Sequence, residues 1–339
     1  MPLDIRENVS LASYTTLGVG GPARYFVRAQ TEQALLDGLA YAAESNLPVF
    51  ILGGGSNILV SDNGFDGVVI QIALRGIEFD QGRVAAAAGE DWDLFVAACV
   101  DNGLAGIECL SGIPGFAGGT PVQNVGAYGQ EVADTIVSVR CLDRQNLELV
   151  DLANEQCGFS YRTSIFNSTM RDRYVVLSVT FELEPGGRPK VIYKDLLNHF
   201  DQHTPTPAEV REVVLNIRRS KSMVIDHNDP NSRSAGSFFK NPIVERSRLA
   251  ELESQFDKVP FFEFGERVKI PAAWLIEHAG FQKGYVLGNA GTSSNHSLAL
   301  INRGGATAAE IIALKKTIQA GVKEKYGIEL SPEPIFVGF

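Results

Sequence analysis

A glycine-rich stretch at residues 112–131 is the part of this chain best suited to hold a ligand. It contains six glycines in twenty residues, and Glu131 is its only charged side chain. Glycine lets the backbone turn through positive φ and lets a partner approach closely. Successive bare N–H groups suit a phosphate or a flavin ring, whereas flexible linkers are rich in serine and lack large apolar residues. The stretch therefore predicts backbone folded around a ligand, with a mobile loop as the alternative.

A second glycine cluster, residues 53–57, lies between two apolar runs. A dinucleotide fingerprint or a P-loop needs a helix directly after its glycines. Here residues 58–60 and the strand-like residues 68–74 follow instead, and neither Gly-x-Gly-x-x-Gly nor Gly-Lys-Ser/Thr occurs in the chain. We therefore expect these glycines to bind phosphate through backbone amides, without a helix dipole.

Three polar residues stand in unusual surroundings. Arg162 lies in a polar cluster, and its planar guanidinium suits a carboxylate, unless it is a solvated surface arginine. Ser237 precedes two phenylalanines, which predicts a hydroxyl in a dry pocket, with a buried strand carrying a glycine bulge as the alternative. Glu333 lies between two prolines, which restrict the backbone around it and predict a fixed carboxylate. The alternative is an edge-strand carboxylate that faces water. Weaker candidates for sugar or phosphate contacts are Tyr128, Tyr193, Lys221, Lys240 and Asn241.

Histidine and cysteine placement argues against several other chemistries. None of the five histidines lies in the first 198 residues, so the glycine-rich half offers no histidine as base, metal ligand or covalent flavin tether. Without a Cys/His cluster or a Gly-x-Ser-x-Gly motif, we expect neither a metal site nor a hydrolase triad. The four cysteines form no Cys-x-x-Cys pair and predict reduced thiols in the core.

Length and charge bound the remaining possibilities. A chain of 339 residues with 45% hydrophobic residues can form two or three domains. Its net charge of −10 argues against nonspecific binding to nucleic acid or anionic membranes. No window approaches eighteen apolar residues and the first residues lack an apolar core, so we expect no membrane span and no signal peptide. These features predict a cytoplasmic protein, and no obligate protein partner is evident.

Periodicity predicts the elements that position these residues. A strand at residues 24–29, a helix capped by Thr31 and a strand at residues 48–52 predict a βαβ unit. Further strands are expected at residues 84–88, 135–142, 174–183, 298–302 and 331–337, and further helices at residues 91–101, 207–220, 271–279 and 307–326. Residues 226–237, rich in Asp, Asn, Ser and Pro, predict a loop beyond a domain boundary near residue 222.

In this order, the fragments resemble the UDP-N-acetylenolpyruvoylglucosamine reductases, the MurB family of flavoenzymes. Besides Asn8, the matching pieces are residues 15–21, 52–57, 112–129, 161–162, 236–242 and 330–333. The resemblance implies an α+β fold, with an FAD-binding domain of the vanillyl-alcohol-oxidase (PCMH) type in two subdomains and a separate α+β substrate-binding domain. The implied limits are residues 1–70 with 320–339, residues 71–221, and residues 222–319. The long insert between Pro207 and Ser237 suits the type I form of the family.

The resemblance also implies a reaction. The family reduces UDP-N-acetylglucosamine enolpyruvate to UDP-N-acetylmuramate in peptidoglycan synthesis, with NADPH as reductant and non-covalent FAD. Nicotinamide gives hydride to flavin N5 and leaves, and the enolpyruvyl substrate then takes the hydride at its vinyl CH2 carbon. The resulting negative charge on the α-carbon and carboxylate is an enolate.

Residues matching the family's motifs acquire roles from this resemblance. Arg162 is expected to grip the carboxylate as charge grows there, and Ser237 to donate a proton to the α-carbon. Glu333 is expected to be protonated or to share its charge with Arg162, because a bare carboxylate would repel an enolate. The residues expected to contact the UDP-sugar are Tyr128, Tyr193, Lys221, Asn241 and Asn295. The residues expected to bind FAD are Gly53, Gly54, Gly55, Ser56, Asn57, Gly112, Pro114, Gly115, Gly118, Gly119, Gln123, Asn124, Gly126 and Ala127.

Two segments depart from the family pattern. Residues 260–264 place phenylalanines where some members have a tyrosine lid, and a phenylalanine can stack on uracil but cannot donate a hydrogen bond. Residues 291–296 also differ, although Asn295 remains a plausible sugar contact. Two alternatives stay open: another FAD oxidase or dehydrogenase of this fold, and a flavin-binding module without catalysis.

Overall fold

The computed structural model describes residues 3–200 and 203–339, and the chain divides into two compact units. The first unit comprises Met1–Val9, Ala23–Gly55 and Phe65–Val224; the second comprises Ser10–Pro22, Ser56–Gly64 and Ile225–Phe339. The second glycine cluster is thus divided, with Gly53 to Gly55 in the first unit and Ser56 and Asn57 in the second. The three functional domains expected from the resemblance remain a prediction.

The first unit begins with a four-stranded sheet whose strands run in the order β1-β2-β5-β3. The strands are β1 (Ile5–Ser10), β2 (Pro22–Ala29), β3 (Val49–Leu52) and β5 (Phe65–Ile72). Both β2 and β3 pair with β5 in parallel. Helix α1 (Glu32–Glu44) connects β2 to β3, and the Thr31 hydroxyl caps it by accepting from the N–H of Ala34 at 3.1 Å. The predicted strand–helix–strand unit is therefore confirmed.

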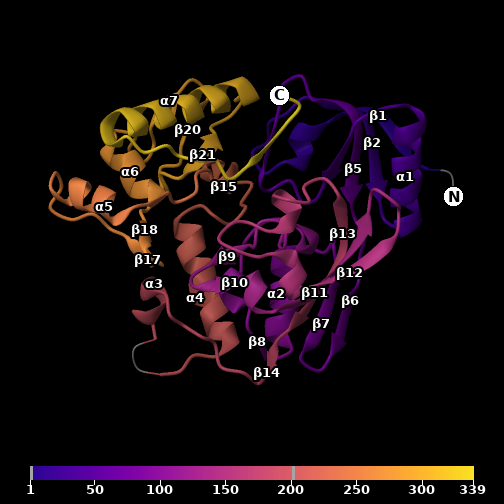
Figure 1. Ribbon diagram of the computed structural model, residues 1–339, viewed down its shortest axis with the longest axis horizontal. Helices are drawn as coiled ribbons and strands as arrows, with labels where there is room; N and C mark the ends of the chain where they lie inside the picture. The colour runs from indigo at the N-terminus through magenta and orange to yellow at the C-terminus, as the bar shows by residue number, and fades with distance from the viewer. Residues whose placement is uncertain (1–2, 201–202) are drawn as a thin grey trace. The chain divides into compact units, whose positions relative to one another are not determined.

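A five-stranded antiparallel sheet forms the second layer of strands in this unit, in the order β12-β11-β13-β7-β6 (Figure 1). Its strands are β6 (Ile77–Asp80), β7 (Arg83–Ala87), β11 (Ile136–Asp143), β12 (Leu149–Ala153) and β13 (Tyr174–Glu182). Helix α2 (Trp92–Asp101) packs two aromatic rings, Trp92 and Phe95, against Phe181 at 5.8 and 5.3 Å. The Trp92 indole N–H donates to the carbonyl of Leu110 at 3.1 Å, so this core fixes the backbone where the glycine-rich stretch begins.

Two helices and several short strands complete the first unit. They are β8 (Leu104–Ala105), β9 (Gly126–Ala127), β10 (Gln130–Glu131), β14 (Glu184–Pro185), α3 (Lys194–Leu197) and α4 (Pro207–Ser220). Helix α4 has the predicted bounds because Thr206 and Glu209 form a capping box and Pro207 opens the first turn. Its buried stripe consists of Val210, Val214 and Arg218.

The second unit contains small sheets covered by helices. Its strands are β4 (Ile58–Val60), β15 (Ser234–Ser237), β16 (Ile243–Val244), β17 (Phe262–Phe264), β18 (Arg267–Lys269), β19 (Val286–Leu287), β20 (Ala290–Thr292), β21 (Ala299–Asn302) and β22 (Ile335–Val337). Its helices are α5 (Arg246–Glu253), α6 (Ala272–His278) and α7 (Ala308–Tyr326). One sheet has the order β15-β21-β20-β19, another β16-β18-β17, and β22 pairs in parallel with β4.

One sequence prediction in this unit is wrong. Residues 226–237 were expected to form a loop, but Ser234–Ser237 form strand β15, which pairs antiparallel with β21. The register shifts between Ser234 and Ser237, and Gly236 has a φ of 71°. The polar composition of the segment concealed a strand because its pairing is supplied by a distant part of the chain.

Other expectations about buried and apolar segments have clear outcomes. All four cysteines are free and buried, as predicted. Burial raises the pKa of the Cys99 and Cys109 thiols to about 12. Within the described chain, no helix combines the length and hydropathy that crossing a bilayer requires.

Candidate functional site

The two glycine clusters meet in the first unit. A Cβ on Gly54 would lie 2.7 Å from the Cα and 2.9 Å from the carbonyl carbon of Gly115. Real side chains do not tolerate such distances to backbone, so this approach requires glycine at position 54. Gly115 itself has a φ of 122°, and its carbonyl accepts from the N–H of Trp92 at 3.0 Å. The ends of β3 and α2 therefore hold the two glycine-rich backbones against each other.

The donors at this junction fit the phosphate groups of the expected cofactor. Among the backbone hydrogen bonds of residues 3–200 and 203–339, none uses the N–H of Gly54, Gly55 or Gly115. A Cβ placed on Gly53 or Gly119 would meet no protein atom within 4 Å. Backbone N–H groups without protein acceptors, beside open space, are the groups that bind a pyrophosphate in loops of this kind.

Other glycines of the stretch are explained by packing within the protein. A Cβ on Gly118 would lie 2.4 Å from the Cβ of Ala88, and one on Gly112 would lie 2.8 Å from Leu215. The N–H of Gly112 donates to Asp93 at 2.6 Å. These two glycines shape the loop, whatever else they contact. Of the remaining predicted cofactor residues of this stretch, Asn124 is buried, and Pro114, Gln123, Gly126 and Ala127 are half-buried.

Arg162 contacts the glycine-rich stretch directly. It lies in a tight turn in which Ser160 and Thr163 exchange two backbone hydrogen bonds of 2.9 and 3.0 Å. Its φ is 55°, a left-handed conformation that is uncommon for arginine. Its Nη2 donates to the carbonyl of Gly126 at 2.9 Å. The structure thus joins a half-buried guanidinium to the segment expected to hold the flavin, unlike a solvated surface arginine.

Three of the weaker candidates form a second cluster in the first unit. The rings of Tyr128 and Tyr193 meet edge to face with centroids 5.4 Å apart. Burial raises the pKa of both tyrosines. Lys221, just after α4, places its Nζ 3.6 Å from an oxygen of Asp195. The charge of Asp195 acts on both tyrosines, so the cluster brings together two hydroxyls and an ion pair.

Sequence reasoning missed Arg218, which lies behind this cluster. Only 7% of its surface is exposed, and burial lowers its pKa although Tyr128 and Asp93 act in the opposite direction. Its Nη2 donates to the carbonyl of Met223 at 2.8 Å, and its Nε finds no acceptor in the described chain. An arginine in the apolar stripe of α4 was the available signal, since Val210 and Val214 precede it by eight and four positions.

In the second unit, main-chain pairing brings Ser237 and Glu333 near each other in the ladder. The N–H of Phe238 donates to Leu298 at 2.8 Å, and its carbonyl accepts from the N–H of Glu333 at 2.9 Å. Asn57 donates its side-chain amide to the carbonyl of Glu333 at 3.3 Å. Ser237 is half-buried beside the fully buried Phe238. The register shift beside Gly236 matches the alternative of a strand with a glycine bulge, and the dry pocket around the Ser237 hydroxyl stays a prediction.

The other predicted residues of the second unit lie in simpler surroundings. Asn241 accepts the N–H of Ala272 at 2.8 Å and so satisfies the first turn of α6. Asn295 is exposed in the loop after β20. The backbone carbonyl of Ser56 accepts the Thr16 hydroxyl at 3.4 Å. The Asn241 side chain thus supports the fold.

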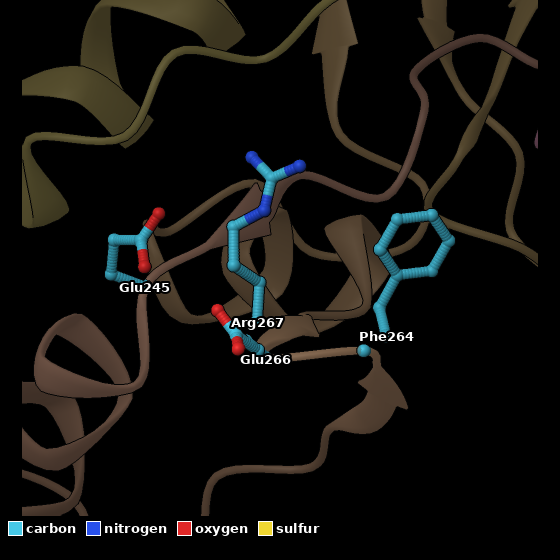
Figure 2. A pocket seen from close by; sticks show the side chains of 5 residues that line it. Glu245, Phe264, Glu266 and Arg267 are labelled. Atoms are coloured by element: carbon cyan, nitrogen blue, oxygen red, sulfur yellow. The ribbon is translucent and has the colours of Figure 1, made fainter.

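A separate pocket of about 420 Å³ lies at the β17–β18 hairpin of the second unit. It is lined by Glu245, Phe264, Gly265, Glu266 and Arg267. In Figure 2 the Arg267 side chain rises between those of Glu245 and Phe264. Neither Ser237 nor Glu333 lines it, so it is distinct from the surroundings of these two residues.

Two family models match parts of the chain. Residues 23–152 match the model of an FAD binding domain. Residues 229–337 match the model of the UDP-N-acetylenolpyruvoylglucosamine reductase C-terminal domain. The first match contains both glycine clusters, and the second contains Ser237 and Glu333.

Full-length relatives extend the match to the whole chain. UDP-N-acetylenolpyruvoylglucosamine reductase of Thermobifida fusca is 46% identical, over 100% of this chain and 99% of the relative. The enzyme of that name from Nocardia farcinica is also 46% identical, over 98% and 90%. The crystal structure of the reductase (MurB) from Thermus caldophilus superposes with a TM-score of 0.69 at 27% identity, covering 98% of this chain and 100% of that one. The chain belongs to the UDP-N-acetylenolpyruvoylglucosamine reductase family.

Proposed function

We propose that this protein reduces UDP-N-acetylglucosamine enolpyruvate to UDP-N-acetylmuramate with NADPH through FAD, a step of peptidoglycan synthesis. Full-length membership of the reductase family supports the reaction. The single observation that carries it within the structure is the hydrogen bond from Arg162 to Gly126. That bond supports the proposal because it joins a guanidinium, a group suited to the substrate carboxylate, to the segment expected to bind flavin.

Bound FAD supplies a carrier that accepts hydride from one ligand and returns it to the next. The bare N–H groups of Gly54, Gly55 and Gly115 would hold its pyrophosphate, and the open space at Gly53 and Gly119 would admit it. Gly112 and Gly118 contribute by shaping this backbone. NADPH loses a hydride, and the substrate gains that hydride and a proton across its carbon–carbon double bond.

Arg162 binds the enolpyruvyl carboxylate. Negative charge builds on the α-carbon and carboxylate once hydride reaches the neighbouring CH2 carbon. A guanidinium already held in place stabilises this charge more in the transition state than in the ground state, and so raises the rate. Its bond to Gly126 uses Nη2, one of the donors of the planar guanidinium, and holds the fork in place.

Ser237 donates the proton to the α-carbon, and Glu333 is the third proposed catalytic residue. A serine hydroxyl is a weak acid, but the enolate carbon is strongly basic, so the transfer is favourable after hydride addition. The ladder between Phe238 and Glu333 fixes the backbone that carries both groups. Glu333 holds a proton, because a bare carboxylate would repel the enolate. Tyr128, Tyr193, Lys221, Asn241 and Asn295 bind the UDP-sugar.

Anaerobic colour changes test this proposal. NADPH should bleach the yellow protein, and UDP-N-acetylglucosamine enolpyruvate should restore the colour while UDP-N-acetylmuramate forms in equal amount. A colour that returns only with oxygen would identify an oxidase instead. A colour that NADPH bleaches and neither oxidant restores, or protein that takes up no FAD, would reject the reductase.

A further inference from the structure

The side chain of Asn124 joins three segments of the first unit. Its Nδ2 donates to Glu131 Oε2 at 2.6 Å and to the carbonyl of Ser160 at 3.2 Å, and its Oδ1 accepts the N–H of Ala133 at 3.1 Å. Only 1% of its surface is exposed. Both amide donors are therefore occupied by protein acceptors, although the sequence suggested contact with FAD.

One of these contacts leads to Arg162. Ser160 begins the tight turn that has Arg162 near its apex. Arg162 then donates back to Gly126, two residues beyond Asn124. Two hydrogen bonds therefore connect the stretch and the turn: one runs from Asn124 to Ser160, and the other runs from Arg162 back to Gly126. Ser164, after the turn, adds a third by donating its hydroxyl to Val122 at 2.6 Å.

We propose that Asn124 is a positioning residue that holds the Arg162 turn in register with the glycine-rich stretch. This inference rests on the proposed function, in which Arg162 binds the substrate carboxylate beside the flavin. Without the bond from Asn124 to Ser160, the turn keeps its internal hydrogen bonds, but only the bonds of Arg162 and Ser164 still hold it to the stretch, so its start can shift. A displacement of about 1 Å at a reacting group can slow a reaction on the order of 10²-fold.

The conformation and chemistry at position 124 both favour asparagine. Its φ is 46°, a left-handed conformation that asparagine and aspartate adopt more readily than other side chains with a Cβ. An aspartate could keep this backbone and the bond from Ala133. It would, however, turn a carboxylate oxygen toward the oxygens of Glu131 and Ser160, and repulsion would replace both donated bonds.

The experiment uses Asn124→Asp alone and combined with Glu131→Gln. The glutamine amide can donate to the introduced carboxylate, which restores the 124–131 link with its polarity reversed. The contact with the Ser160 carbonyl stays repulsive in both variants. The double variant should therefore recover FAD content and flavin reduction by NADPH, while reoxidation by the enolpyruvyl substrate stays about 10-fold or more slower than in the wild type.

Asn154→Asp is the matched control. Asn154 also donates its side-chain amide to two carbonyl oxygens, of Ala133 at 2.9 Å and of Ile136 at 2.8 Å, but neither belongs to the Arg162 turn. The same chemical change there should lower the melting temperature without changing the ratio of the reoxidation rate to the reduction rate. In the Asn124 variants that ratio should fall.

Each outcome decides the inference. Recovery of wild-type reoxidation in the double variant, or an equal loss in both half-reactions, overturns a positioning role. If the ratio of the reoxidation rate to the reduction rate falls equally in Asn154→Asp, the positioning role is overturned as well. Any loss of stability would then lower that ratio. If wild-type protein is not reoxidised by the substrate at all, the proposed function fails rather than this inference.

Discussion

The two units hold their proposed catalytic residues by different kinds of contact. In the first unit, side-chain hydrogen bonds tie the left-handed Arg162 turn to the glycine-rich stretch: Asn124 reaches Ser160, and Arg162 itself reaches Gly126. In the second unit, mainly backbone hydrogen bonds place Ser237, in strand β15, and Glu333, whose N–H donates to Phe238; one side-chain amide, that of Asn57, adds a bond to the Glu333 carbonyl. A backbone ladder tolerates many side chains, whereas the first arrangement depends on particular ones.

Because of this difference, single substitutions in the two units should affect function and structure differently. Replacing Ser237 should remove a functional group and leave the fold intact. Replacing residues around Arg162 should change geometry as well as chemistry. The half-reactions provide the measurement, because the carboxylate grip and the proton donor are needed only when the enolpyruvyl substrate is reduced.

The largest effect is expected from Ser237→Ala. Loss of one transition-state donor typically costs about 10²- to 10³-fold in rate, so reoxidation by the substrate should slow by at least about 10²-fold. Flavin reduction by NADPH and the melting temperature should stay near wild type, because the bonds around Phe238 that place this strand are main-chain bonds. Stopped-flow absorbance of the flavin measures both steps. If flavin reduction and reoxidation slow equally, Ser237 supports the fold, and the two units do not differ in the way proposed.

The sequence predicted those parts of the fold whose causes are local. Helix α4 was placed correctly because Thr206, Pro207 and its apolar stripe all lie within the helix or next to it. Strand β15 was missed because its polar sequence is made a strand by pairing with β21. Local patterns carry capping and periodicity, but they carry no information about which distant strand completes a sheet.

The same limit applies to the candidate site. Glycine content identified the stretch that meets Gly54, but not which glycines face a ligand and which, like Gly118, make room for Ala88. The side chain of Asn124 was assigned to FAD because nothing in the sequence indicates its contact with Ser160, 36 positions away. Residue types suggested chemistry, whereas tertiary contacts decided which residues position others.

Substitutions at the neighbouring Gly53 and Gly54 should distinguish a packing role from a role in cofactor binding in the first unit. Gly54→Ala introduces a Cβ within 3 Å of the Gly115 backbone, so it should destabilise the protein by about 1–3 kcal/mol and weaken FAD binding. Gly53→Ala meets no protein atom within 4 Å and should leave the stability of the flavin-free protein unchanged. If FAD occupies that space, Gly53→Ala should still weaken FAD binding. Thermal unfolding of the flavin-free variants and fluorescence titration with FAD measure the two effects, and unchanged FAD affinity in Gly53→Ala would contradict the proposed placement.

A smaller effect is expected at Asn241 in the second unit. Asn241→Asp keeps the oxygen that accepts from Ala272, whereas Asn241→Ala removes it and should cost about 1 kcal/mol of stability. If the amide of Asn241 also binds the UDP-sugar, both variants should raise the KM of the enolpyruvyl substrate while only alanine lowers the melting temperature. An unchanged KM in the aspartate variant would leave Asn241 with a structural role alone.

The smallest effect is a pH dependence confined to the first unit, at Asp93. Burial acts to raise the pKa of this carboxyl, but the Arg211 guanidinium, with N–O distances of 2.5 and 3.0 Å, and the Gly112 N–H outweigh it and hold the pKa below its ordinary value of 3.8. A carboxyl with a lowered folded-state pKa stabilises the fold above its unfolded pKa and loses that contribution as the pH falls through the folded value.

Asp93→Asn should therefore be less stable than wild type near neutral pH, and the difference should shrink as the pH falls below about 4. Urea unfolding midpoints between pH 3 and pH 7 measure this difference, and FAD fluorescence follows release of the cofactor in parallel. Because Asp93 connects Gly112 to α4 through side-chain bonds, acid should release FAD from wild-type protein at a pH near the loss of this contribution. A difference between the two proteins that stays constant with pH would show that ionisation of Asp93 does not hold the glycine-rich stretch, and the first unit would then depend on its side chains less than its hydrogen bonds indicate.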